Sequence, residues 1–102
     1  MIEPKGFRAV RQAVIEALRT GSFRHEMRDE FDEKNLLGYG MVTVDDVLTI
    51  IRSSRGTDYS CSPLHGDPKI ACHLLKTGGW YVKFYFADPH TVFISVHRMR
   101  LS

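Results

Sequence analysis

Cysteine is scarce in this chain: Cys61 and Cys72 are the only two among its 102 residues. Two thiols are too few for the disulfide framework on which many small secreted domains depend. The spacings that usually hold zinc, such as CxxC, HxH and HExxH, are also missing. We therefore expect a reduced protein without a metal site.

Long apolar stretches are missing as well. No run approaches the roughly 18 apolar residues that a helix needs to span a bilayer, and residues 1–6 lack the apolar segment of a secretory signal. We therefore expect a cytoplasmic protein that does not contact a membrane. With 102 residues the chain fits a single domain, and it is too short for an enzyme with a separate cofactor module.

Neither sign of charge is in large excess. The 14 Lys and Arg stand against 12 Asp and Glu, a net charge of +2, whereas dedicated nucleic-acid domains are usually more basic. The charges nevertheless form blocks: residues 1–28 hold six Lys or Arg against three acids, and residues 29–46 hold six acids against one Lys. This pattern permits binding of nucleic acid, but solvated surfaces would look the same.

The first half of the sequence has the period of helices. Apolar residues at three- and four-residue spacing predict a helix over residues 7–20, ended by Gly21: Phe7, Val10, Val14 and Leu18. A second helix is predicted from Ser22, with three apolar residues at four-residue spacing: Phe23, Met27 and Phe31. A third begins at Thr43, a good N-cap, and ends near Gly56.

The second half has the composition of strands. Residues 69–75, 80–86 and 91–98 are rich in β-branched and aromatic side chains and are separated by short loops, as in antiparallel hairpins. A fourth strand could lie around residues 57–61. We expect one α+β domain over residues 1–102, with two to three N-terminal helices packed on one face of a three- to four-stranded antiparallel sheet.

Alternation along the last two strands predicts a polar face. A three-residue loop over residues 88–90 keeps the apolar sides together and pairs Phe84 with Ile94 on the core side. The same register places Tyr81 beside His97 on the opposite face, which also carries Lys83.

The preceding strand is placed by the loop over residues 77–79. If this loop also has three residues, Cys72 and Leu74 point into the core and His73 lies beside Lys83. The predicted open face then presents six polar side chains: His73, Tyr81, Lys83, Tyr85, Ser95 and His97. A shift of one residue in either loop would move part of this set to the other face.

A lysine, two histidines and two tyrosines on one sheet face suit a phosphodiester substrate. The cation would stabilise the charge that develops on the phosphoryl oxygens, and imidazole or phenol groups would move protons. Aromatic rings would also stack on unpaired bases. A polar, solvated face is nevertheless common in antiparallel sheets without such a function. Near the N-terminus, His25 between Arg24 and Arg28 could likewise face a phosphate or only water.

Four short stretches carry a family resemblance. Residues 23–28, 44–48, 80–86 and 93–97 read FRHEMR, VDDVL, WYVKFYF and FISVH. In these stretches the chain resembles small bacterial toxins of the RelE/ParE and MqsR type, and a related group of small bacterial domains of unknown function, over about residues 22–98. The resemblance implies an endoribonuclease that cuts mRNA without a cofactor, either free or on the ribosome, and that a partner antitoxin protein holds inactive.

The resemblance also assigns roles to residues. Tyr81 stands at the place of a strand tyrosine of MqsR-like toxins, His97 where they tend to have a basic residue, and His73 near a polar active-site position. We therefore predict four catalytic residues, with His97 or His73 as general base or acid and Lys83 stabilising charge: His97, Lys83, His73 and Tyr81. Six further residues are predicted to bind RNA: Arg98, Arg100, Tyr85, Arg24, His25 and Arg28.

Two other classes of function stay open. The chain could be a non-catalytic protein-binding or regulatory module, in which the polar face or an edge strand docks a peptide. It could also be a small-molecule hydrolase that uses Cys61 or Cys72 as its nucleophile. Cleavage specificity, the identity of the partner and the oligomeric state are not contained in these patterns.

Overall fold

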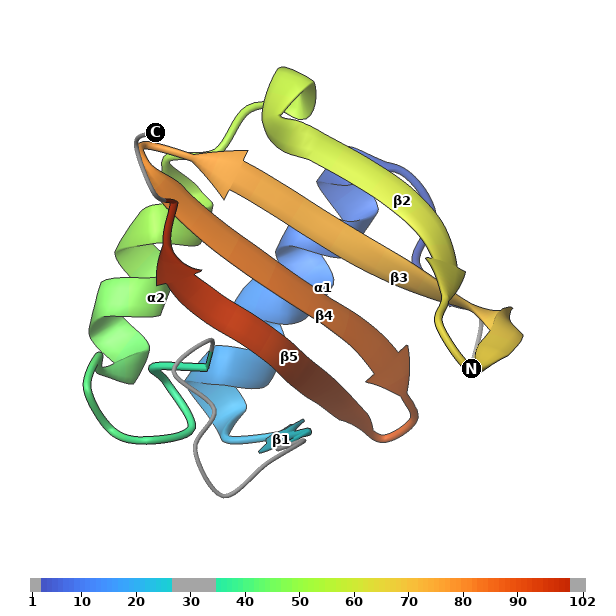
Figure 1. Ribbon diagram of the computed structural model, residues 1–102, viewed down its shortest axis with the longest axis horizontal. Coiled ribbons are helices and arrows are strands. Elements are labelled where there is room, and N and C mark those ends of the chain that lie inside the picture. Colours follow the sequence, from blue (N-terminus) through green and yellow to red (C-terminus); the bar gives the residue numbers. More distant parts are fainter. Residues whose placement is uncertain (1–2, 27–34, 100–102) are drawn as a thin grey trace.

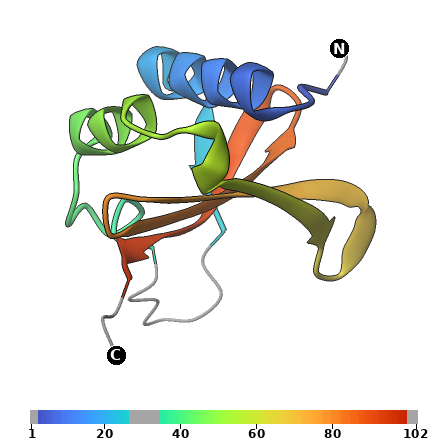
Figure 2. The same ribbon diagram turned by 90° about the horizontal axis from the view of Figure 1, so that it is seen from above.

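The computed structural model describes residues 3–26 and 35–99. Within these residues, one five-stranded sheet forms the centre of the fold, and two helices lie on one of its faces (Figures 1 and 2). The helices are α1 (Phe7–Thr20) and α2 (Val44–Arg52), and a short 3-10 turn covers Gly56–Asp58. The strands are β1 (Phe23–His25), β2 (Tyr59–Leu64), β3 (Asp67–Thr77), β4 (Trp80–Ala87) and β5 (His90–Arg98). The fold class is α+β, as predicted.

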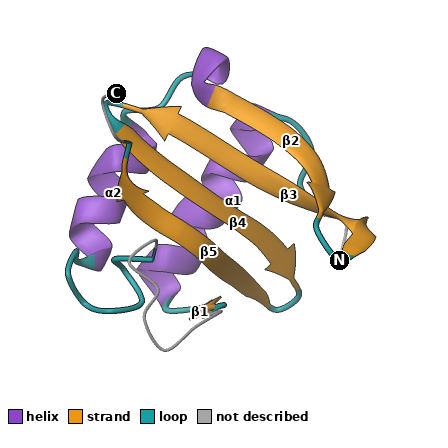
Figure 3. Ribbon diagram, viewed as in Figure 1, coloured by secondary structure: helices purple, strands orange, loops and turns teal. Residues whose placement is uncertain are grey.

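The sheet differs from the predicted one in size and direction. Its order is β1-β5-β4-β3-β2, and β1 runs parallel to β5 while all other neighbours are antiparallel (Figure 3). The expectation of three to four antiparallel strands is therefore wrong, because the sheet has five strands and is mixed. We call the side against α1 and α2 the helix-covered face and the other side the open face. In the described part of the chain, no helix is long and apolar enough to cross a bilayer.

Helices α1 and α2 form where the sequence predicts them. Gly21 ends α1 in the left-handed conformation, with φ of 78°, which a glycine adopts without a steric cost. At the start of α2 the backbone N–H of Asp46 donates to the hydroxyl of Thr43 (3.1 Å), and the N–H of Thr43 donates to the Asp46 carboxylate (2.9 Å). This capping box fixes the first turn of the helix.

The second predicted helix is wrong over residues 22–25. Phe23–His25 form β1, whose backbone pairs with β5. The ring of Phe23 packs edge-on against that of Phe93, with centroids 5.8 Å apart. Strand pairing and ring packing outweigh a helical pattern of only three apolar positions. Met27 and Phe31, the other two positions, lie outside the described residues.

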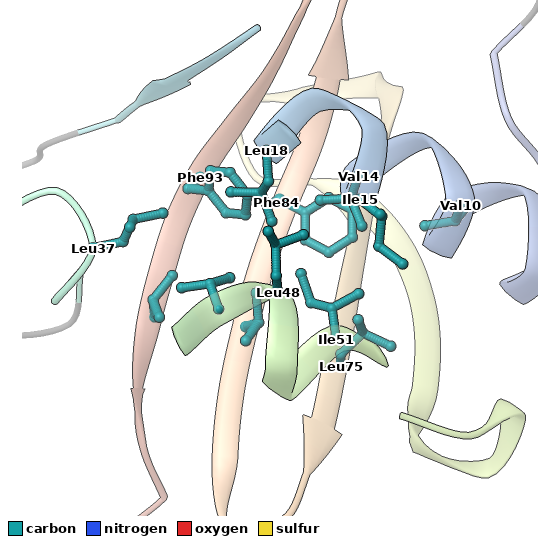
Figure 4. Close-up of a cluster of buried hydrophobic side chains, with 13 residues drawn as sticks. Val10, Val14, Ile15, Leu18, Leu37, Leu48, Ile51, Leu75, Phe84 and Phe93 are labelled. Atoms are coloured by element: carbon teal, nitrogen blue, oxygen red, sulfur yellow. The ribbon is translucent and has the colours of Figure 1, made fainter. Parts of the chain in front are cut away.

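The hydrophobic core lies between the helices and the sheet (Figure 4). Leu18 of α1 and Leu48 and Ile51 of α2 meet the central strands there. Phe84 and Phe93 are fully buried, and their ring centroids are 5.9 Å apart. The centre of the helix-covered face is thus filled by core packing, whereas no helix covers the open face in the described part of the chain.

The connection between β3 and β4 is a two-residue turn instead of the expected three-residue loop. Thr77 pairs directly with Trp80, and Gly78 and Gly79 have φ of 56° and 83°. Positive φ at both central positions is what a type I′ turn requires. Because the connection is one residue shorter, each side chain of β3 lies on the face opposite to the predicted one.

This shift corrects three placements. Cys72 and Leu74 share the open face, although Cys72 is buried there, so the prediction that both point into the core is wrong. His73 pairs with Phe84 on the helix-covered face, so its predicted position beside Lys83 is also wrong. Lys83 has Leu74 as its β3 neighbour instead.

The register between β4 and β5 follows the prediction over half of its length. Lys83 pairs with Ser95 as expected, but Phe84 pairs with Phe93 and not with Ile94. Ala87 pairs with His90, so the loop has two residues and not the expected three, and the extra residue Ile94 on β5 forms a β-bulge that restores the expected register from Lys83 onward. From the bulge toward the start of β5, the side chains of that strand therefore lie on the faces opposite to the predicted ones.

Candidate functional site

Three rows of side chains cross the open face where β3, β4 and β5 are in register. The first row is Lys76, Tyr81 and His97, the second is Leu74, Lys83 and Ser95, and the third is Cys72, Tyr85 and Val92. Along β3 and β4, neighbouring rows are about 6.6–6.8 Å apart, because their residues are two positions apart in the sequence. Four residues of the predicted site are thereby brought together on one face: Tyr81, Lys83, Tyr85 and His97.

In the first row, Tyr81 lies between a cation and an imidazole. Its ring stacks on that of His97, with centroids 4.8 Å apart and planes 16° from parallel. The Lys76 Nζ lies 6.0 Å from the centre of the same phenol ring, at the outer limit of a cation–π contact. The side-by-side positions on three strands hold these groups together, so the phenol ring orients the imidazole.

The two ring nitrogens of His97 lie in different environments. Nδ1 is 2.9 Å from the backbone carbonyl oxygen of Arg98. A carbonyl can only accept, so in the neutral imidazole Nδ1 carries the proton and Nε2 keeps its lone pair. The residue is only partly buried. Nε2 is therefore the atom that can take a proton from a substrate hydroxyl.

Lys83 and Tyr85 continue the polar strip along β4. Lys83 is partly buried, and no carboxylate within the described ranges pairs with it. Burial raises the pKa of the Tyr85 hydroxyl above its usual 10, and the nearby Glu26 carboxylate and Cys72 thiol raise it further. At neutral pH the second and third rows thus offer a cation and a protonated phenol.

His73 belongs to the other side of the sheet. Its side chain is 2% exposed, and its Nδ1 is 2.8 Å from the Tyr59 hydroxyl. Burial lowers the pKa of His73, and the Glu3 carboxylate, 3.9 Å from Nε2, opposes this shift. The sheet itself separates this imidazole from His97, so the two predicted catalytic histidines cannot act on one phosphate.

The predicted RNA-binding residues are spread over both faces. Arg24 of β1 is exposed on the open face, whereas the ring of His25 points to the other side and burial lowers its pKa. The Arg98 guanidinium lies 4.9 Å from the ring centre of Trp80, at the end of the sheet on the helix-covered side. Both Arg24 and His25 sit on a strand, not on the predicted helix. Two others lie outside the described residues: Arg28 and Arg100.

Two charged residues of the open face were not predicted, Lys76 and Glu26. Lys76 reaches this face through the two-residue turn, and the adjacent glycines were the available signal, since such turns prefer Gly. Glu26 follows β1, and its N–H donates to the carbonyl of Phe93 (2.9 Å). Its Oε2 is buried without a hydrogen-bond partner in the parts of the chain described here. No local pattern pointed to Glu26.

No protein-family model matches the sequence, and neither the curated proteins nor the solved structures contain a match. The described residues hold no group of three or more His, Cys, Asp or Glu that could bind a metal ion. The chemistry of the open face is therefore argued from its own residues.

Proposed function

We propose that this protein is a metal-independent endoribonuclease of the toxin–antitoxin type, which cuts mRNA on its open face. The row of Lys76, Tyr81 and His97 supports this most strongly, because it holds an imidazole with an accessible lone pair beside a phenol and a cation. The resemblance to RelE/ParE and MqsR toxins supports it at Tyr81 and His97, whereas His73, the third position that the resemblance assigns, lies on the helix-covered side.

RNA supplies its own nucleophile in the proposed reaction. His97 Nε2 takes the proton of a 2′-hydroxyl, and the 2′-oxygen attacks the neighbouring phosphorus. The bond from phosphorus to the 5′-oxygen breaks, which leaves a 2′,3′-cyclic phosphate and a 5′-oxygen that takes a proton from solvent. Lys83 and Lys76 stabilise the charge that builds up on the phosphoryl oxygens. Tyr81 positions the imidazole.

An antitoxin protein is the proposed partner. Strand β2 forms one edge of the sheet (Figure 3), and four consecutive residues of it are exposed: Ser60, Cys61, Ser62 and Pro63. An exposed edge strand can pair with an extended peptide of another chain. The same observation favours the second candidate function, a non-catalytic protein-binding module.

The test of the proposed function is cleavage of RNA by the purified protein. Incubation with single-stranded RNA, free and in a translating extract, should give fragments that end in a 2′,3′-cyclic phosphate. His97→Ala should lower the cleavage rate by about 10²–10⁴-fold, because it removes the general base. Lys83→Ala should lower it as well, while both variants keep the circular dichroism spectrum and the unfolding midpoint of the native protein.

Two matched variants serve as controls. His65→Ala and Lys69→Ala remove an exposed imidazole and an exposed ammonium outside the three rows, and both should cleave like the native protein. Intact RNA after incubation with the native protein would contradict the endoribonuclease. In that case, capture of a protein partner that Pro63→Asp prevents would support the binding module.

A further inference from the structure

A cavity of about 380 Å³ lies on the helix-covered side, away from the three rows of the open face. It is open to solvent on one side and is lined by α1, the N-terminal segment and the β4–β5 hairpin, and Figure 2 shows that segment running beside the hairpin. Ala13 and Ala17 line it from α1, and their short side chains leave space above the sheet. The volume falls within the usual range of small-ligand sites, about 300–1,000 Å³.

The charged residues that line this cavity are carboxylates, although Glu16 Oε2 also lies 3.9 Å from the Arg19 guanidinium, in an exposed ion pair. Glu3, Glu16 and Asp88 line it from three separate segments, and its lining residues include no Lys or Arg. Phe86 and Pro89 supply apolar walls between these carboxylates. A hollow with apolar walls and a negative rim favours a ligand that has both an apolar chain and a positive charge.

A buried histidine that does not line the cavity lies behind one of its walls. The ring of His73 is 2% exposed and lies 5.2 Å, centroid to centroid, from that of Phe86. Its Nε2 faces Glu3 Oε1 at 3.9 Å, which is too long for a hydrogen bond, and it has no other partner in the described ranges. Nε2 thus lies directly behind the wall that Glu3 and Phe86 form. The Glu3 carboxylate stands between this unsatisfied nitrogen and the cavity.

We propose that the cavity binds a small aliphatic ammonium ion. The alkyl chain packs against Ala17, Phe86 and Pro89, and the ammonium group lies among the carboxylates of the rim. A neutral ligand with the same chain lacks the charge attraction, and an anionic one is repelled. This binding site is independent of the proposed RNA cleavage, because the sheet separates the cavity from the open face.

Three probes with the same six-carbon chain test the proposal: hexylamine, hexan-1-ol and hexanoate. In an NMR titration of the 102-residue chain at neutral pH, hexylamine should shift the backbone amide signals of residues 86–91, Pro89 excepted, in a saturable manner. Hexan-1-ol should bind about fivefold more weakly, and hexanoate should cause no shift. Equal binding of hexylamine and hexan-1-ol, or no shift at residues 86–91, would overturn the proposal.

Variants assign the binding to the cavity. Glu16→Gln and Asp88→Asn should each weaken hexylamine binding about two- to fivefold, the size expected for one exposed charge. Asp45→Asn removes a carboxylate from α2, outside the cavity, and should have no effect. Ala13→Leu should abolish binding because it fills the space. Unchanged binding of hexylamine in both charge variants would overturn the proposal. Nα-acetyl-lysine methylamide carries the same ammonium group on a peptide side chain, and tighter binding of this compound than of hexylamine would overturn the free amine as the occupant.

Discussion

The two faces of the sheet give His97 and His73 different chemistry. His97 lies on the open face, with Nδ1 bonded to a backbone carbonyl and with part of its ring exposed. His73 lies under the helix-covered side, where Tyr59 and Glu3 are its polar neighbours. An accessible imidazole exchanges protons with a substrate, whereas an enclosed one resists protonation. His73 therefore contributes to the stability of the fold and its dependence on pH.

The first prediction concerns this pH dependence. Burial lowers the pKa of His73 and of His25 below the usual 6.5. As pH falls through about 6.5, the unfolded chain takes up protons that the folded chain does not, so the free energy of unfolding decreases. Urea titrations between about pH 7.5 and 5.5 should show this loss, and His73→Gln should reduce it because an amide does not titrate. A His73→Gln protein with the full pH dependence would contradict the argument.

The second prediction concerns the ring of Tyr81. If the stacked phenol positions His97, Tyr81→Phe should keep the rate of RNA cleavage, because the ring and its 4.8 Å contact remain. Tyr81→Leu should lower kcat by up to about tenfold, since an aromatic pair of this kind stabilises one orientation by about 0.5–1.5 kcal/mol. An equal loss in both variants would instead assign a chemical role to the hydroxyl. The measurement is the cleavage rate of one fluorescent oligonucleotide by the native protein and by each of the two variants.

At the scale of elements, a turn of two glycines decides which side chains of β3 reach the open face. The adjacent glycines favour a two-residue turn, but Thr77 suits both the end of a strand and a loop, so composition alone leaves a three-residue loop open. Because the turn is one residue shorter than expected, Lys76 and Leu74 lie on the open face, where His73 was expected. Only the positive φ of Gly78 and Gly79 settles the register.

The third prediction tests this turn. Gly78 has φ of 56°, and no heavy atom lies within 4 Å of the position that a Cβ atom would take there, so backbone strain alone sets the cost of a side chain. Gly78→Ala should lower the free energy of unfolding by about 1 kcal/mol. Gly78→Asn should cost clearly less, because asparagine tolerates the left-handed region. Equal losses in urea titrations of the two variants would contradict this account.

Long periodic segments could be predicted from the sequence, and short ones could not. Helix α1 repeats its apolar spacing over four turns, and α2 adds the cap of Thr43 and Asp46, so local and tertiary preferences agree. Strand β1 has only three residues and depends on backbone pairing with a strand far along the chain. The bulge at Ile94 likewise follows from the packing of Phe93 into the core, which no local pattern records.

The same limit applies to the site when the whole molecule is considered. Tyr81, Lys83 and His97 could be placed together because alternation within one hairpin fixes them. Lys76 required the correct turn, and Glu26 required the parallel pairing of β1 with β5. The residues that sequence patterns miss are therefore those whose face depends on the exact length of a turn or on pairing with a distant strand. In the three rows, the open face gains the Lys76 ammonium group where the His73 imidazole was expected.

This gain leads to the last prediction, which concerns RNA binding by the whole face. Each phosphate contact on a single strand contributes about 0.7 to the slope of log K against log salt concentration. Lys76→Ala combined with Lys83→Ala should therefore reduce the slope by about 1.4, measured with a 2′-O-methyl RNA that cannot be cleaved. Lys5→Ala combined with Lys69→Ala removes the same charge from exposed positions outside the three rows and should leave the slope unchanged. Equal reductions in the two double variants would mean that RNA is attracted by net charge alone, and that the open face is not its binding site.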